Sequence, residues 1–284
     1  MSNTTSNYQS KIIREIQLRN MSSTTQAAYL SCASRLVAFT GKEPEATSIE
    51  EVKTFLLYLK NERGLGTNSV NHNLNALKFL FNVALAGEHE PLNIQGRKRE
   101  HKLPEVLSQN EVKLIIANTT HLRGKVILLL AYSAGLRVSE ITRLKPEDID
   151  SQRMLIRVCL GKGAKDRYTV MVPYLLEQLR LYWKKYQPKT WLFPGHEAKD
   201  THITEACATR IWKKAKKRAG ITKGRGIHTL RHCFATHLLE AKVNLRTIQI
   251  LMGHSSLMTT AVYLKVTPKS TDEARSAMDL LKFY

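Results

Sequence analysis

Apolar residues recur at helical spacing along most of this chain, and this periodicity limits the possible fold more than any other feature. In the first ninety residues it predicts about four helices, near 9–18, 22–40, 52–64 and 67–86. Only residues 154–160 and 167–173 are rich in the β-branched and apolar residues typical of strands. The fold class is therefore mainly α with a small β-hairpin or sheet (α+β).

Local signals mark several helix ends. Ser48 with Glu51 and Ser108 with Glu111 form two capping-box patterns, each of which predicts a helix start. Residues 124–134 are apolar nearly all round, which predicts a buried core helix. Further helices are predicted at about 174–186, 204–219, 229–241, 245–252 and 257–264.

A basic stretch interrupts the helical pattern and divides the chain. We expect a helical domain at 1–90, a basic linker at 91–103 and a second domain at 104–284. The linker carries Arg97, Lys98 and Arg99. A linker lying along DNA and a solvated surface loop would both have this composition.

The charge balance narrows the partners. The chain has 44 Lys and Arg against 24 Asp and Glu, a formal net charge of +20, which favours a polyanion such as nucleic acid or a membrane surface. No apolar run reaches the roughly 18 residues that a membrane span needs. The polar N-terminus lacks the layout of a signal peptide, so we expect a cytoplasmic, nucleoid-associated protein. The four scattered cysteines form no metal-binding pattern, and we expect reduced thiols and no metal.

A His-x-x-Arg pattern is the first candidate for chemistry. His228 and Arg231 are three residues apart, so on a helix they share a face. A guanidinium supplies a planar fork of donors and an imidazole supplies a proton or a hydrogen bond, which together suit a phosphate. A satisfied surface pair is the alternative.

Four other residues are weak signals when taken singly. Arg137 lies in a tight turn, where it could cap carbonyls or pair with Glu140. Lys162 lies at the tip of the predicted hairpin, where most lysines are simply solvated. His254 follows Gly253, and Tyr263 stands nine residues later in an apolar pattern.

In order along the chain, these residues match a known set. The segments GLRVSEI (135–141), GKGAKDR (161–167), HTLRHCFATHLLE (228–240) and LRTIQILMGHSSLMTTAVYL (245–264) resemble the tyrosine recombinase (phage integrase) family, in its Xer-like and integron-integrase branches. The resemblance extends over the whole chain, because residues 1–90 are similar to the family's SAM-like core-binding domain. It implies a two-domain, C-shaped DNA clamp.

The resemblance also implies a reaction. A site-specific recombinase of this family cleaves and rejoins DNA through a covalent 3′-phosphotyrosyl intermediate, for integration, excision or resolution. It implies Tyr263 as nucleophile, Arg137 and Arg231 as phosphate clamp, His254 as a further phosphate contact, Lys162 as general acid and His228 as general base. No cofactor, metal ion or ATP is implied. The implied partners are double-stranded DNA at a specific recombination site and, at synapsis, a tetramer.

Other basic residues are candidates for the DNA backbone. One predicted helix carries a dense run of charge, Lys213, Lys214, Lys216, Lys217 and Arg218. Phosphate contacts would give affinity without sequence choice, and a merely solvated helix face would show the same run.

Three rival functions remain open from the sequence. The chain could be a catalytically silent DNA-binding regulator of the same fold, a type IB topoisomerase-like enzyme or a basic protein of a membrane surface.

Overall fold

The computed structural model describes residues 6–98, 103–159, 166–195 and 200–265. The chain divides into two compact units, residues 1–101 and 102–284. The finer boundaries expected from the sequence, 1–90, 91–103 and 104–284, stay a prediction.

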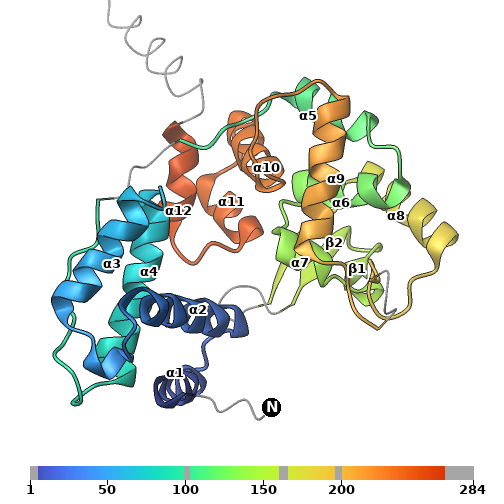
Figure 1. Cartoon of the computed structure of the whole chain (residues 1–284). Helices are drawn as coiled ribbons and strands as arrows, with labels where there is room; N and C mark the ends of the chain where they lie inside the picture. The colour runs from blue at the N-terminus through green and yellow to red at the C-terminus, as the bar shows by residue number, and fades with distance from the viewer. Residues whose placement is uncertain (1–5, 99–102, 160–165, 196–199, 266–284) are drawn as a thin grey trace, which may run out of the picture. The chain divides into compact units, whose positions relative to one another are not determined.

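The first unit is a small bundle of helices (Figure 1). Its elements are α1 (Asn7–Leu18), α2 (Ser23–Thr40), η1 (Pro44–Ala46), α3 (Ile49–Asn61), α4 (Thr67–Phe79) and the π-helical turn η2 (Leu80–Ala84). The four predicted helices are confirmed, and Ser48 with Glu51 forms the predicted capping box at the start of α3. The helix predicted over 67–86 differs in its last part, where the backbone widens into η2.

Residues that we expected to begin a linker pack onto this first bundle. Leu92 is buried in its core together with residues of all four helices. The side-chain amide of Asn71 donates to the carbonyl of Arg97 at 2.8 Å and accepts from its N–H at 2.9 Å. These contacts fix residues 92–97 against α4.

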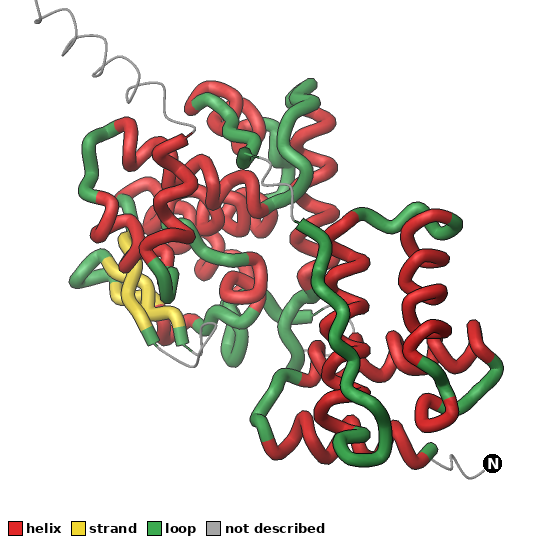
Figure 2. The backbone as a smooth tube through the Cα atoms, turned by 90° about the vertical axis from the view of Figure 1, so that its left-hand side faces the viewer, coloured by secondary structure: helices red, strands yellow, loops and turns green. Residues whose placement is uncertain are grey.

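The second unit is a group of helices with a three-stranded sheet at one side (Figure 2). Its helices and turns are α5 (Gln109–Ala117), α6 (Leu122–Ser133), α7 (Val138–Thr142), η3 (Pro146–Asp148), α8 (Pro173–Tyr186), α9 (Glu205–Arg218), α10 (His228–Glu240), α11 (Leu245–Met252), α12 (Leu257–Ala261) and η4 (Val262–Lys265). The strands β1 (Ile149–Asp150), β2 (Leu155–Val158) and β3 (Arg167–Val170) are antiparallel in the order β1-β2-β3. The predicted hairpin is confirmed, and the two-residue β1 is an addition that the sequence did not predict.

Helix α6 is the centre of the second unit. Its residues 126–131 are buried, as the apolar pattern predicted, and it packs against α5, α8, α9 and α10. Buried apolar residues from all of these helices and from β2 form one continuous core. This core fixes the turn after α6, on which the polar site described below is built.

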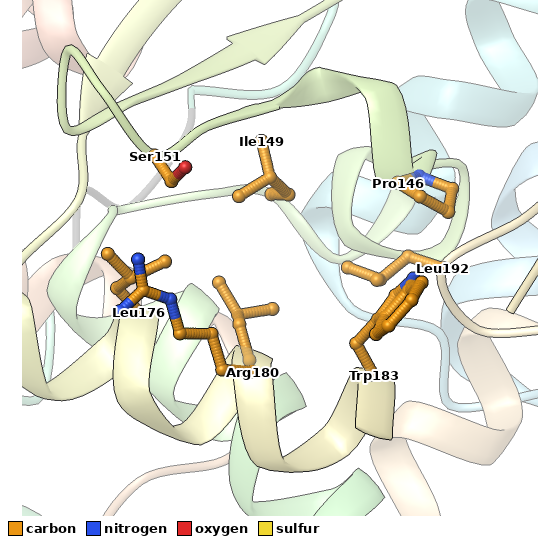
Figure 3. Close-up of a pocket in the computed structure, with 8 residues that line it drawn as sticks. Pro146, Ile149, Ser151, Leu176, Arg180, Trp183 and Leu192 are labelled. Atoms are coloured by element: carbon orange, nitrogen blue, oxygen red, sulfur yellow. The ribbon is translucent and has the colours of Figure 1, made fainter. Parts of the chain in front are cut away.

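A surface hollow lies between α8 and residues 146–151, which run from η3 through β1 (Figure 3). Arg180 and Trp183 of α8 line one side of it, and Ile149 and Ser151 line the other. Its volume is about 240 Å³. It shares no residue with the polar site. Within the described ranges, no helix has the length and apolar character needed to cross a membrane.

Candidate active site

The turn between α6 and α7 positions Arg137. Gly135 adopts a left-handed φ of +63°, and a Cβ atom there would overlap the ring of Phe234 on α10, so only glycine fits. Arg137 then precedes α7, where its backbone N–H and its Nη1 each donate to the carboxylate of Glu140 at 2.7 Å. The pairing of Arg137 with Glu140 considered from the sequence is therefore present.

Glu140 is the hub of the site. Arg167, from β3, donates from both terminal nitrogens to its two carboxylate oxygens at 2.8 Å each. Burial alone would raise the pKa of Glu140, but the hydrogen bonds and charge of Arg167 and the N–H of Arg137 lower it to about 2. The carboxylate is thus ionised at neutral pH and holds two guanidiniums in place.

Arg231 is a buried guanidinium on α10. Only 4% of the residue is exposed, and its terminal nitrogens donate to the carbonyls of Gly135 and Met252. Its Nη1 also lies 3.7 Å from Glu140 Oε2. Burial, followed by the charge of Arg137, lowers the pKa of Arg231 to about 9. Arg231 therefore still carries its positive charge at pH 7.

The end of α11 binds three arginines in succession. The carbonyl of Leu251 accepts from Arg167 Nε at 3.0 Å, that of Met252 accepts from Arg231, and that of Gly253 accepts from Arg137 Nη2 at 3.2 Å. A helix C-terminus presents unsatisfied carbonyls and a partial negative charge, which favours cations there. Together with Glu140, this helix end concentrates three guanidiniums at one place.

Gly253 allows that close approach. Its φ is +60°, and a Cβ atom would lie 2.7 Å from Cδ of Arg167. His254 follows directly, with its Nδ1 hydrogen bonded to Thr260 Oγ1 at 2.9 Å. Burial, then the charges of Arg231 and Arg137, lower the pKa of His254 to about 4. It is therefore a neutral imidazole at pH 7, and its Nε2 is the nitrogen available for a ligand contact.

Tyr263 lies in η4 and is buried, with 4% of the residue exposed. Its ring belongs to a small apolar cluster with Phe234, Ala235, Ile248 and Met252. Its hydroxyl is hydrogen bonded to Nδ1 of His232, on α10, at 2.9 Å. Burial raises the pKa of Tyr263, and Arg231 and Arg137 partly offset that rise. Nothing in the sequence pattern singles out His232.

His228 begins α10, and the residue is exposed. It lines a cavity of about 400 Å³ together with His232, Arg225 and Glu105. Partial desolvation of the ring and then the charge of Arg231 lower the pKa of His228. The cavity gives a path from the surface to the ring of His232.

The structure thus gathers most of the predicted set. Arg137 and Arg231 share Glu140 and the end of α11, and His254 follows that helix end. Lys162 lies outside the described residues. The additional members are Arg167 and His232. Both lie inside the motif segments quoted above, and His232 directly follows Arg231, but nothing in the linear pattern shows which partners they reach.

The residues expected to bind DNA are mostly exposed. Arg97, Lys98, Lys213, Lys214, Lys217 and Arg218 are exposed, while Arg99 lies outside the described residues. Lys216 differs, because its ammonium donates to the carbonyls of Thr222 and Gly224 at 2.9 and 2.7 Å. Lys216 therefore holds the loop after α9.

The four cysteines, Cys32, Cys159, Cys207 and Cys233, are free thiols. Over the ranges that the structure describes, no three His, Cys, Asp or Glu side chains are grouped closely enough to hold a metal ion.

Family models match both units. Residues 105–270 match the phage integrase family, and residues 9–89 match the phage integrase N-terminal SAM-like domain. The chain belongs to the phage integrase family. This recombinase is 42% identical to y4qK of Sinorhizobium fredii, a candidate integrase/recombinase, over 95% of this chain and 88% of the relative. It is 36% identical to the tyrosine recombinase XerA of Pyrococcus horikoshii, over 85% of this chain and 84% of the relative.

Solved structures agree with this assignment. The crystal structure of a XerA recombinase is 27% identical, with a TM-score of 0.56 over 98% of this chain and 99% of that chain. The XerH site-specific recombinase, solved on its palindromic difH substrate after cleavage, has a TM-score of 0.73 at 20% identity over 98% of this chain and 92% of that chain. The phage integrase family member described here is accordingly a tyrosine-type site-specific DNA recombinase with the family's fold.

Proposed function

We propose that this recombinase cleaves double-stranded DNA at a specific site by attack of Tyr263 on a backbone phosphate, forming a 3′-phosphotyrosyl bond. The observation that carries the proposal is the convergence of three guanidiniums at the end of α11, with the Tyr263 ring in the small apolar cluster that includes residues of the same helix. Exchange of one phosphate ester for another conserves the bond energy, so the reaction needs no ATP.

Arg137 and Arg231 are the proposed phosphate clamp. Both are held by carbonyls and by Glu140 before any DNA arrives. Cations fixed in advance stabilise the charge on a transferring phosphoryl group without reorganisation during the reaction. His254, as a neutral imidazole, would add a hydrogen bond from Nε2 to a non-bridging oxygen.

Two roles rest on the resemblance alone. Lys162 is proposed as the general acid that protonates the departing 5′-oxygen. The resemblance implies His228 as the general base, while its position on the cavity beside Arg225 also suits a phosphate contact.

Double-stranded DNA with a specific recombination site is the proposed partner, and the proposed place of action is the cytoplasm, at the nucleoid. The net charge of +20 and the exposed basic side chains of α9 support a polyanionic partner. XerH was solved on difH DNA and the Tn1549 integrase on transposon right end DNA, and both have this fold. Exchange between two duplexes would require four protomers at synapsis.

A covalent trapping experiment tests this function. The protein is incubated with a library of nicked duplexes that carry a randomised segment, so that cleavage near the nick releases a short strand and leaves the protein attached. Complexes that survive SDS are digested and their DNA is sequenced. The proposal predicts one enriched sequence, no adduct with Tyr263→Phe, and nearly unchanged DNA binding by that variant.

The rival functions give different results in the same experiment. A silent DNA-binding regulator would bind DNA but give no SDS-resistant product. A topoisomerase-like enzyme would give adducts on many sequences and would relax supercoiled plasmid without strand exchange. Binding to anionic vesicles that persists while no adduct forms would favour a membrane-surface protein.

A further inference from the structure

We propose that His232, rather than His228, is the general base that accepts the proton of Tyr263 during strand cleavage and returns it during rejoining. The inference rests on the proposed function, because it assigns a proton acceptor to that reaction. His232 would be a catalytic residue in the strict sense, since it contacts the reacting oxygen.

The geometry distinguishes the two histidines. Nδ1 of His232 lies 2.9 Å from the Tyr263 hydroxyl oxygen, within the range for a hydrogen bond along which a proton moves. The two rings are tilted by 48° with their centroids 5.8 Å apart, so the contact is through the ring nitrogen and not through stacking. His228 lies one helical turn earlier on α10, at the exposed start of the helix.

The surrounding helices fix both partners of this hydrogen bond. Tyr263 packs among Phe234, Ala235, Ile248 and Met252, which belong to α10 and α11. His232 is flanked on α10 by Arg231 and Cys233, both of which are buried. The hydrogen bond therefore joins two elements whose positions are set by one apolar cluster.

The surroundings of His232 keep its ring neutral, and a neutral imidazole has one ring nitrogen that can accept a proton. The titratable groups around it are His228 and Arg231 on its own helix, His254 after α11, Tyr263 on η4, and Glu105 and Arg225 across the cavity. Burial, then the charges of His228 and Arg231, lower the pKa of His232 to about 4, so the ring is neutral at pH 7. A phosphate bound by Arg231 adds negative charge beside the ring, which offsets that depression when the proton must move.

A base is needed because of where Tyr263 lies. Its burial raises the pKa of the phenol above the ordinary value near 10, so little phenolate forms at neutral pH. In the proposed step, the Tyr263 oxygen bonds to phosphorus while its proton passes to Nδ1 of His232. The bond from phosphorus to the 5′-oxygen breaks, and that oxygen takes a proton from the general acid. Rejoining reverses each transfer.

The first test compares two matched substitutions, His232→Gln and His228→Gln, in single-turnover cleavage of a nicked duplex that carries the sequence recovered by trapping. Glutamine keeps a hydrogen-bond acceptor but cannot take up a proton. We expect His232→Gln to slow cleavage by about a hundredfold or more, the usual size of a general-base contribution. Cleavage by His232→Gln within about threefold of the unsubstituted protein would overturn the proposal.

Fluorination of Tyr263 separates proton acceptance from mere positioning. A difluorotyrosine at position 263 ionises at lower pH and depends less on a base. We expect it to restore at least about tenfold of the rate lost in His232→Gln and to restore nothing in His228→Gln. Rescue of His228→Gln instead would reassign the base. If the difluorotyrosine lowered the rate equally in the unsubstituted protein and in both glutamine variants, His232 would be a positioning residue only.

A measurement on the unsubstituted protein guards against misfolded variants. Nitrogen-15 NMR of labelled histidine should show Nδ1 of His232 unprotonated and Nε2 protonated at pH 7. A proton already on Nδ1 would contradict the proposal. If the proposed recombinase function itself were wrong, the result would be different: the unsubstituted protein would give no covalent product with any duplex in the library.

Discussion

At the scale of single residues, the site is a buried positive cluster arranged around one carboxylate. Glu140 accepts hydrogen bonds from Arg137 and Arg167 and lies 3.7 Å from Arg231. Three guanidiniums so close to one another repel, and the carboxylate offsets only one of their charges. The remaining positive charge is what an incoming phosphate would neutralise.

The first residue-scale prediction concerns the clamp. Arg231→Lys keeps the charge but loses the planar fork that reaches two carbonyls at once. We expect single-turnover cleavage to fall about a hundredfold or more, while the Kd for the duplex changes by less than about threefold. Gel-shift titration and SDS-resistant adduct formation measure the two quantities. An equal loss in both would show that Arg231 serves only binding.

The second residue-scale prediction concerns the loss of folding stability at low pH. His232 and His254 have pKa values lowered to about 4, whereas an unfolded histidine titrates near 6.5, so the unfolded chain binds more protons between these values. Stability is therefore fully present above about pH 6.5 and is lost as pH falls toward 4. Glu140, with its pKa near 2, adds a further loss between about pH 4.5 and 2.

Urea unfolding at pH 7.5, 5.5 and 4.5 checks this. We expect the free energy of unfolding of the second unit to fall by on the order of 1–3 kcal/mol per histidine across that range. His254→Gln should flatten the curve. A stability that stays constant from pH 7.5 to 4.5 would contradict the buried, neutral state of these rings.

At the scale of elements, the C-terminus of α11 organises the site. Its last carbonyls bind arginines from three other places in the chain: the turn after α6, β3 and α10. Arg167 connects the sheet to this helix end, because it joins β3 both to Glu140 and to Leu251. Strand β3 is thereby linked through Glu140 to the arginines of the proposed phosphate clamp.

The element-scale prediction compares Arg167→Gln with Arg157→Gln, on neighbouring strands. Arg167 is 10% exposed and bridges two elements, whereas Arg157 is 41% exposed and pairs with Asp148. We expect Arg167→Gln to lower the free energy of unfolding by about 3 kcal/mol, because it leaves Glu140 buried with fewer partners. Arg157→Gln should lower it by less than about 1 kcal/mol. Similar losses in both variants would contradict the bridging role.

The elements differ in how well they could be predicted from the sequence. Periodicity and capping boxes predicted the helices, because those signals are local. Strand β1 was missed, because two residues are too short to show an alternating pattern. The polar motif residues were identified one by one. Glu140 as a hub and His232 as the partner of Tyr263 depend on contacts between residues 27 and 31 positions apart, which spacing alone does not encode.

At the scale of the whole molecule, the positive net charge is the main determinant of the expected affinity for DNA. The net charge of +20 predicts affinity for any duplex, and exposed lysines on α9 are prime candidates for backbone contacts. Because such contacts release counterions, they weaken as salt rises, whereas the proposed cleavage at Tyr263 would depend on the buried arginines.

The whole-molecule prediction follows from this difference between the exposed lysines and the buried arginines. Replacing Lys213, Lys214 and Lys217 by Gln should make the slope of log affinity against log salt shallower by about one for each lost phosphate contact. Cleavage at saturating protein should stay within about threefold. Lys216→Gln is the matched control, because its ammonium is bound within the protein. An unchanged slope in the triple variant would place the DNA elsewhere.

The proposed reaction depends above all on the Tyr263 hydroxyl oxygen forming the covalent bond to DNA. Mass spectrometry of trypsin-digested covalent complex tests it most directly, because the chain contains ten tyrosines and the modified peptide identifies the one that reacted. The account predicts a nucleotide attached through a phosphoester to Tyr263 alone. Attachment to another tyrosine or to a serine would contradict it.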